Sequence, residues 1–189
     1  MEILFRIFIK DKDNTKWIDN TNQDITLYWD IINPIVNKLT INPNGGKYND
    51  STSSTEITGE TGTKYSIQNN LTRTGYTFTG WNTDANGSGT SYSNGGSITT
   101  KSSVTLYAQW KANIYTVQYD GNGATGGSTA NSSHTYGTQK ALTSNGYTKT
   151  NSNFVGWNTK ADGSGTSYTD GQSIINLTEE QILVDDKET

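Results

Sequence analysis

The amino-acid sequence predicts a β-rich chain made of tandem small modules. Thr, Asn and Ser number 31, 21 and 18 among the 189 residues, while 30% of the chain is hydrophobic and 17% is charged. Such polarity is common in disordered chains, yet five Trp and eleven Tyr bring the aromatic fraction to 11%. Disordered segments are poor in aromatic and β-branched residues. The abundance of Thr, Tyr, Val and Ile between Gly and Asn therefore favours β-strands joined by tight turns.

An internal repeat determines the predicted domain organisation. Residues 80–98 (GWNTDANGSGTSYSNGGSI) and residues 156–174 (GWNTKADGSGTSYTDGQSI) are identical at 14 of 19 positions without a gap. Upstream, residues 39–46 correspond to residues 117–124 at a slightly different spacing. Self-similarity over such a distance indicates that one structural unit occurs twice.

The repeat predicts a first module over residues 35–112 and a second module over residues 113–189. Residues 1–34 are interpreted as a degenerate partial copy, because residues 25–28 (ITLY) echo the VTLY motif of the first module. Atypical terminal copies are expected in repeat arrays. The segment after Met1 has no basic region and no cleavage site of small residues, so no signal peptide is expected.

Alternation of apolar and polar residues predicts the strands. Residues 104–110 place Val, Leu, Ala and Trp on one face and Thr, Tyr and Gln on the other. Residues 115–119 alternate in the same way, and further strands are expected at residues 76–81 and 154–157. The Asp-Gly-Asn-Gly sequence at residues 120–123 predicts a tight turn, because these residues tolerate positive φ angles.

Two segments carry weak helical signals. Residues 178–181 (TEEQ) form a capping-box pattern, which predicts a short helical turn near the end of the second module. Residues 64–71 are expected to form at most one helical turn, because Asn69 and Asn70 disfavour its extension. Helix is therefore expected only as a minor component.

Large aromatic residues are expected to supply much of each core, because the modules are near the lower size limit for an independent domain. The predicted core comprises Phe78, Trp81, Leu106, Trp110, Phe154 and Trp157. Tyr92 and its copy Tyr168 are expected to contribute to the core as well. Tyr107 lies on the polar face of its strand. Tyr107, Tyr92 and Tyr168 are also the candidate surface contacts, since an aromatic ring with a polar tip suits a partly wet binding site.

Composition excludes several classes of function. A formal net charge of -4 and a pI of about 4.9 disfavour a nucleic-acid surface, which needs clustered Lys and Arg. No apolar run approaches the roughly 20 residues of a membrane-spanning helix. The absence of Cys removes disulfides, Cys-ligated zinc and thiol nucleophiles.

The search for catalytic or metal-binding groups yields no predicted catalytic, metal or cofactor site. His134 is the only histidine, and its place in a Ser- and Asn-rich stretch favours an exposed loop or strand-start histidine over a Ser-His-Asp triad. The paired acids at residues 179–180 and 185–186 are read as solvated charges. Residues 84–89 (DANGSG) resemble a calcium loop, but the second copy begins with Lys160 and full loops of this type carry more carboxylates. A Gly-rich turn is the favoured interpretation of this loop.

Two further chemistries find little support. The glycines from residue 121 to residue 127 resemble a phosphate-binding loop, but Ser, Thr and Asn follow where a helix is required. A Lys–Asn isopeptide crosslink would need a buried carboxylate between the two side chains, and nothing in the sequence demonstrates that arrangement.

The combined motifs resemble those of a known family. They are YTVxYDGNG (residues 115–123), GWNTxAxGSGTxY (residues 80–92 and 156–168) and TLYAQW (residues 105–110). Together they resemble the internalin B-repeat family, also called the Listeria–Bacteroides repeat. The resemblance implies a β-rich α+β module with a β-grasp, ubiquitin-like topology, arranged in tandem in large bacterial surface proteins. The second copy departs from the pattern, since its final strand lacks the Ala-Gln-Trp ending.

The resemblance to this family, together with the lack of a predicted catalytic, metal or cofactor site, predicts non-catalytic repeat modules of a bacterial cell-surface, envelope or secreted protein. The modules are expected to act as a spacer or stalk, and as adhesion or interaction modules for a host or cell-surface protein or a glycan. No cofactor, nucleic acid or membrane insertion is expected. Two alternatives remain open, a carbohydrate-binding module and an accessory region of a larger extracellular enzyme.

Overall fold

The computed structural model of the protein describes residues 9–10, 17–18, 36–67 and 70–188. The chain divides into two units, Met1–Asn33 and Pro34–Thr189. In the first unit, β1 (Ile9–Lys10) pairs with β2 (Trp17–Ile18) in antiparallel fashion. The rest of the degenerate copy expected over residues 1–34 lies outside the described residues.

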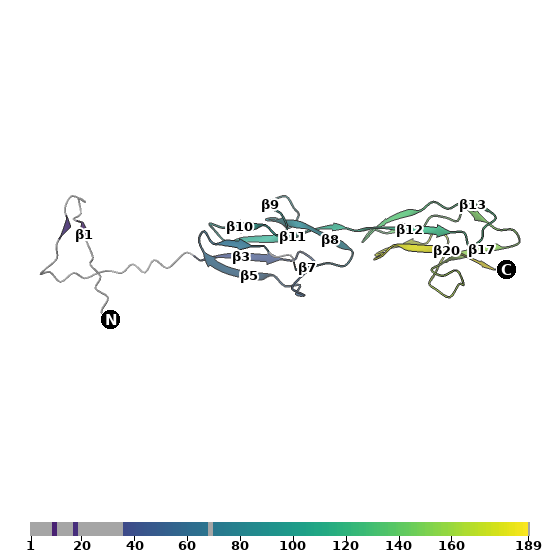
Figure 1. Ribbon diagram of the computed structural model, residues 1–189, viewed down its shortest axis with the longest axis horizontal. Helices are drawn as coiled ribbons and strands as arrows, with labels where there is room; N and C mark the ends of the chain where they lie inside the picture. Colours follow the sequence, from purple (N-terminus) through teal and green to yellow (C-terminus); the bar gives the residue numbers. More distant parts are fainter. Residues whose placement is uncertain (1–8, 11–16, 19–35, 68–69, 189) are drawn as a thin grey trace. The chain divides into compact units, whose positions relative to one another are not determined.

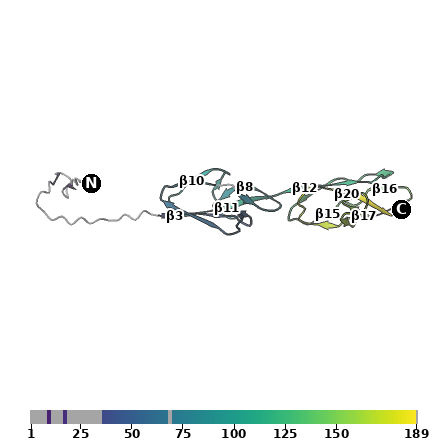
Figure 2. The ribbon, with the colours of Figure 1, turned by 60° about the horizontal axis from the view of Figure 1, so that its bottom comes forward.

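The first module is built on a five-stranded sheet in the order β5-β3-β11-β8-β9 (Figure 1). Its strands are β3 (Val36–Asn42), β5 (Thr55–Glu60), β8 (Tyr76–Asn82), β9 (Ser91–Tyr92) and β11 (Val104–Ala112). β3 and β11 pair in parallel, whereas the other pairs are antiparallel. Two short antiparallel pairs complete the module, β4 (Lys47–Tyr48) with β7 (Leu71–Thr72) and β6 (Lys64–Ser66) with β10 (Ser97–Thr99). In Figure 2, β10 lies off the plane of β3 and β11.

The second module repeats this arrangement in the order β14-β12-β20-β17-β18. Its strands are β12 (Ile114–Asp120), β14 (Ser132–Thr135), β17 (Asn153–Asn158), β18 (Ser167–Tyr168) and β20 (Gln181–Glu188). The short pairs are β13 (Gly126–Gly127) with β16 (Tyr147–Thr148), and β15 (Lys140–Ala141) with β19 (Ser173–Ile174). β12 and β20 again pair in parallel. The sequence repeat is therefore a repeat of strand order and register.

The expected α+β class with β-grasp topology is wrong, because none of the described residues is helical. Residues 64–66 form β6, and Tyr65 and Ile67 are buried at alternate positions, which is the period of a strand. The capping-box pattern at residues 178–181 leads directly into β20. Short connections rich in Thr, Gly and Asn cannot offset the cost of helix nucleation. Accordingly, no described helix is long and apolar enough to cross a membrane.

The core of the first module includes Trp81, which is 1% exposed and belongs to one buried cluster with the fully buried Leu39 and Leu106. Phe78 contacts Trp81 and Trp110 edge to face, with ring centroids 5.3 and 5.6 Å apart. Both Phe78 and Trp110 are partly buried against the core. The indole N–H of Trp110 donates to a backbone carbonyl of the turn after β3 at 3.0 Å, which fixes the ring over that turn.

The second core is assembled around the fully buried Trp157, with Phe154 against it at 5.0 Å. β20 lacks the Ala-Gln-Trp ending, yet it pairs with both β12 and β17, so the sheet closes. Lys187 stands opposite Phe154 where Trp110 stands opposite Phe78 in the first module. Tyr147 adds aromatic bulk from the neighbouring β16, at 6.3 Å from Trp157, and its hydroxyl donates to the carbonyl of Tyr119 at 2.8 Å.

A buried asparagine organises the Gly-rich loop of each repeat. The Oδ1 atom of Asn82 accepts the N–H groups of Asp84 and Gly89 at 2.8 and 2.9 Å. Its Nδ2 group donates to the Gly87 carbonyl and to the Ser91 hydroxyl. Asn158 makes the equivalent bonds to Lys160, Gly165, Gly163 and Ser167 in the second module. The Asn of the GWNT motif therefore replaces the backbone pairing that the loop cannot supply.

A second asparagine ties the turn after the first strand to the rest of the module. Asn44 has a φ of 47° and Asn122 a φ of 44°, a left-handed conformation that Asn tolerates. Nδ2 of Asn44 donates to the carbonyls of Ala85 and Ala108, both at 2.9 Å. Nδ2 of Asn122 makes the same two bonds in the second module, to Ala161 and Asp185. The predicted turn thus connects the Gly-rich loop to the last strand.

His134 lies on β14 and is buried in a polar network, so the expectation of an exposed histidine is wrong. Its side chain is 2% exposed, and Nε2 lies 2.8 Å from the Ser132 hydroxyl. That hydroxyl lies 3.0 Å from the hydroxyl of Tyr119, which accepts the N–H of Thr143 at 2.7 Å. Burial, together with the nearby Lys140 ammonium, lowers the pKa of His134 below its ordinary value of 6.5. The folded protein therefore holds this imidazole in its neutral form near neutral pH.

We predict that Asn158→Ala destabilises the chain by about 2–4 kcal/mol, because it leaves two partly buried backbone N–H groups without their acceptor and removes two donated bonds. Denaturant unfolding followed by tryptophan fluorescence measures this change. Asn153→Ala, at the exposed opposite end of β17, is the matched control and should change stability by less than about 0.5 kcal/mol. Equal effects of the two substitutions would contradict the structural role of Asn158.

We predict that the free energy of unfolding falls as pH drops below about 6.5, because the unfolded chain binds a proton at His134 before the folded chain does. The slope is at most about 1.4 kcal/mol per pH unit, the limit for one proton. His134→Gln keeps a polar partner for Ser132 and should flatten the profile between about pH 7.5 and 5.5. Identical profiles for the two proteins would refute this linkage.

Candidate functional site at the repeat junction

The candidate surface tyrosines do not form one site. Tyr92 and Tyr168 lie on β9 and β18, each half-buried against the core of its own module and opposite Trp81 or Trp157. Tyr107 lies half-buried in the middle of the first sheet on β11, between β3 and β8. The structure therefore places the three rings on three separate strands of two modules.

The loop that resembles a calcium site uses its oxygen atoms internally. Asp84 accepts the N–H of Asn86 and the hydroxyl of Ser88 at 3.3 and 2.9 Å. In the second copy, Asp162 accepts both the hydroxyl and the N–H of Ser164, and these two bonds lower the pKa of its exposed carboxyl. Among the residues that the structure describes, no group of three or more His, Asp or Glu is placed to hold a metal ion.

The geometry around His134 lacks the parts of a catalytic triad. Its Nε2 partner, the Ser132 hydroxyl, is itself buried and shared with Tyr119. Within the described part of the chain, His134 Nδ1 is buried and has no hydrogen-bond partner, so no carboxylate orients the ring. A nucleophile of this type needs an oriented base and an open approach. The network instead fills the interior of the module.

A single residue connects the two modules. β11 ends at Ala112 and β12 begins at Ile114, so only Asn113 lies between them. The N–H of Asn113 donates to the carbonyl of Gly75 in the first module, and its carbonyl accepts the N–H of Tyr136 in the second, both at 2.9 Å. Its side chain accepts the Thr77 hydroxyl at 2.6 Å and donates to the Tyr115 hydroxyl at 3.1 Å. Every polar group of this connector is therefore bonded to the modules it joins.

Aromatic packing accompanies these hydrogen bonds. The rings of Tyr76 and Tyr136 meet edge to face with centroids 5.4 Å apart. Gly75 lies directly under the Tyr136 ring, and a Cβ atom there would coincide with ring atoms. Gly75 also has a φ of 75°, so both the left-handed backbone and the close approach require glycine.

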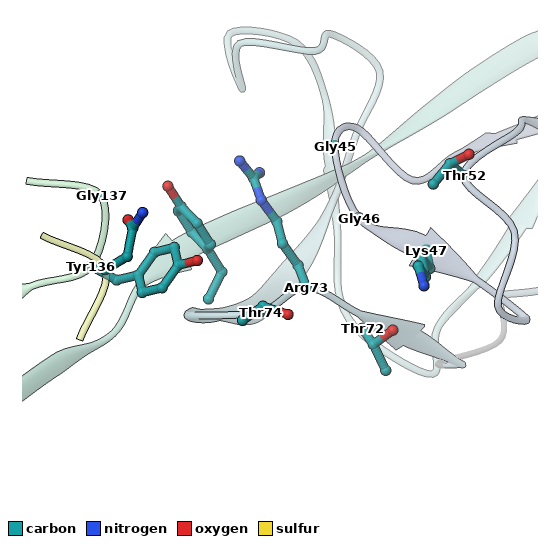
Figure 3. A pocket seen from close by; sticks show the side chains of 11 residues that line it. Gly45, Gly46, Lys47, Thr52, Thr72, Arg73, Thr74, Tyr136 and Gly137 are labelled. Carbon is teal, nitrogen blue, oxygen red and sulfur yellow. The ribbon is translucent and has the colours of Figure 1, made fainter. Parts of the chain in front are cut away.

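These residues border a groove of about 730 Å³, which we call the junction groove (Figure 3). Its principal lining residues are Lys47, Arg73, Thr74 and Tyr76 of the first module and Tyr136 and Asn176 of the second. The Arg73 guanidinium lies 3.9 Å from the centroid of the Tyr76 ring, and Nη1 donates to the carbonyl of Asn44 at 3.3 Å. In the view of Figure 3, Arg73 stands between Tyr136 and Lys47. The junction groove is open, cationic and partly aromatic.

The sequence repeat placed the module boundary between residues 112 and 113, beside Asn113, but the residues of the junction groove were not predicted from the sequence. One signal was present in the comparison of the repeats. The second copy has Asn151-Ser152 where the first has Gly75-Tyr76, so the two copies differ at the residues that contact the next module. In addition, the second repeat has Tyr136 where the first repeat has Thr61, directly before the Gly-Thr dipeptide that both repeats share.

Comparison with known proteins identifies relatives of both modules. The pattern of the Listeria-Bacteroides repeat domain matches residues 38–109 and 115–183. A protein of Evansella cellulosilytica named "Putative Gly-rich membrane protein" is 38% identical over 128 residues, which are 61% of this chain and 14% of that protein. A "Putative membrane protein" of the same organism is 42% identical over 77 residues, which are 37% of this chain and 11% of that protein. No solved structure matches the chain.

The matches to the repeat pattern cover most of the chain and agree with the two sheets of identical strand order. The matched stretch is a small part of each relative, so the relatives' length lies mostly outside the region compared. The chain therefore belongs to the Listeria–Bacteroides repeat domain family, of which it contains two tandem copies.

Proposed function

We propose that the two repeats form a non-catalytic spacer of a larger bacterial surface protein and hold a binding region away from the cell envelope. The observation that carries this proposal is the connection through Asn113 alone. A flexible linker varies its end-to-end distance because its residues rotate freely. Asn113 has no such freedom, since its N–H, its carbonyl and both ends of its side-chain amide are hydrogen-bonded.

The relatives support a place at the cell envelope. Both are named as membrane proteins, and the region shared with this chain is a minor part of each. A repeat unit that recurs inside long envelope proteins suits a spacer, because reach grows with the number of copies while each copy contacts only its neighbours.

Surface chemistry supports the same proposal. The chain is rich in Thr, Ser and Asn, and only 17% of its residues are charged. Hydroxyl and amide side chains on outward strand faces keep an exposed array soluble. An adhesive contribution to a host or cell-surface partner would then arise from repetition, because linked weak contacts bind with higher avidity than one contact.

We predict that the distance between the modules is narrowly distributed. Because the protein lacks Cys, spin labels at Lys101→Cys and Lys160→Cys, both exposed positions, report one distance by pulsed electron resonance. Inserting Gly-Ser-Gly-Ser after Asn113 should broaden the distribution severalfold by adding freely rotating residues. The same insertion between Ser53 and Ser54, in an exposed turn of the first module, is the control and should leave it narrow. If the distance distribution of the parent protein is as broad as that of the variant with the insertion after Asn113, the spacer proposal is contradicted.

We predict that Gly75→Ala destabilises the first module and its contact with the second by about 2–4 kcal/mol, through left-handed strain and overlap with the Tyr136 ring. Gly62→Ala is the matched control, because Gly62 has a similar φ of 87° but open space around its Cα. It should cost only about 1–2 kcal/mol from strain. Tyr136→Ala should remove the difference between the two substitutions. A difference that persists in the Tyr136→Ala background would show that the ring is not its cause.

A further inference from the structure

The junction groove has a charge that is opposite to that of the chain. The protein carries a net charge of -4, yet the groove contains Lys47 and Arg73 and no Asp or Glu. The salt bridge found in the described residues joins Lys38 to Glu56 and involves neither of these cations. Two positive charges without an acidic partner create a local positive potential that attracts anions.

Arg73 is held in place while most of its donors remain available. Its guanidinium stacks on Tyr76 and lies 5.9 Å from the centroid of the Trp110 ring. One donor, Nη1, binds the Asn44 carbonyl, and no other hydrogen bond or ion pair of Arg73 is found in the described part of the chain. A stacked guanidinium loses little freedom when it binds a carboxylate, because its planar fork is already oriented.

The remaining lining has the chemistry of a carbohydrate site. Tyr76 and Tyr136 are half-buried rings, and Thr52, Thr72 and Thr74 add exposed hydroxyl groups. Aromatic rings pack against the apolar face of a sugar, while hydroxyl groups and the Asn176 amide exchange hydrogen bonds with its hydroxyls. A carboxylate on the same sugar would accept hydrogen bonds from the available N–H donors of Arg73.

We propose that the junction groove binds an acidic polysaccharide, with a uronate carboxylate on Arg73 and Lys47 and sugar rings against Tyr136. An acidic peptide is the less favoured ligand of the same charge. Extended peptides gain affinity by adding a strand to a free sheet edge. The strands beside the groove, β4 and β7, are two residues long and already paired with each other.

The second repeat supplies a matched reference position. Lys149 occupies the place of Arg73, and its Nζ contacts the Asn122 carbonyl at 3.4 Å as Arg73 contacts Asn44. Lys149 does not line the junction groove. A lysine at this position is thus compatible with the fold of the repeat.

The test is calorimetric titration of the whole chain with oligogalacturonides at low ionic strength. Cello-oligosaccharides serve as the neutral comparison and oligo-glutamate as the acidic peptide. We expect binding of the galacturonides that weakens as salt is added, because the contact is electrostatic. Arg73→Gln and Lys47→Gln should each weaken binding by roughly tenfold, the loss of one charge-assisted bond. Arg73→Lys should retain part of the affinity, and Lys149→Gln should leave it unchanged.

Several results would overturn the proposal. These are no galacturonide binding, equal binding of the neutral oligosaccharide, or affinity that Arg73→Gln and Lys47→Gln leave intact. Binding of oligo-glutamate with equal affinity would assign the groove to acidic peptides and reject the carbohydrate. Thermal unfolding checks each variant, and the exposed side chain of Lys47 keeps the test decisive if Arg73→Gln fails to fold. The outcome is independent of the spacer proposal, which concerns the distance between the modules.

Discussion

Each module depends on the hydrogen bonds of one buried asparagine, which ends β8 in the first module and β17 in the second. Asn82 and Asn158 are 1% and 0% exposed, and each directly follows the tryptophan at the centre of its core. The Gly-rich loop beyond it is exposed and buries no apolar side chain of its own. Without these bonds the loop would have little to order it, because small polar residues gain almost nothing from burial. The asparagine therefore couples an otherwise weak loop to the best-packed part of the sheet.

The two cores fill the same framework with different side chains. In the first module Gly59 on β5 leaves room for the hydroxyl end of Tyr65, which reaches under it from β6. In the second module His134 and Lys140 hold the corresponding strand positions, and His134 is buried while Lys140 is exposed. The exchange places an imidazole in the interior of the second module.

The junction is a property of the pair of repeats and of neither repeat alone. Asn113 is hydrogen-bonded to both modules. Because Gly75 has no side chain, the ring of Tyr136 can lie against its backbone. The junction groove is lined by residues of both modules, among them the rings of Tyr76 and Tyr136 and several glycines that have no side chain to fill it. In an array of such units, a site between two copies contains side chains that neither copy brings together alone. A comparison of single repeats therefore does not reveal such a site.

The sequence by itself determined the two repeats, their strands and the aromatic positions of their cores, because alternation and self-similarity are local patterns. Trp81, Trp157 and Leu106 are buried, and Phe78, Trp110 and Phe154 pack beside them. The helical turn expected at residues 178–181 is wrong, because a four-residue capping pattern carries no information about the strand that follows it. Only the tertiary structure decided the absence of helix from the described residues, the parallel pairing of first and last strands, and the junction groove. The reason is physical, because Arg73 and Tyr136 are 63 residues apart in the chain and meet only when two folded sheets are joined by one fully bonded residue.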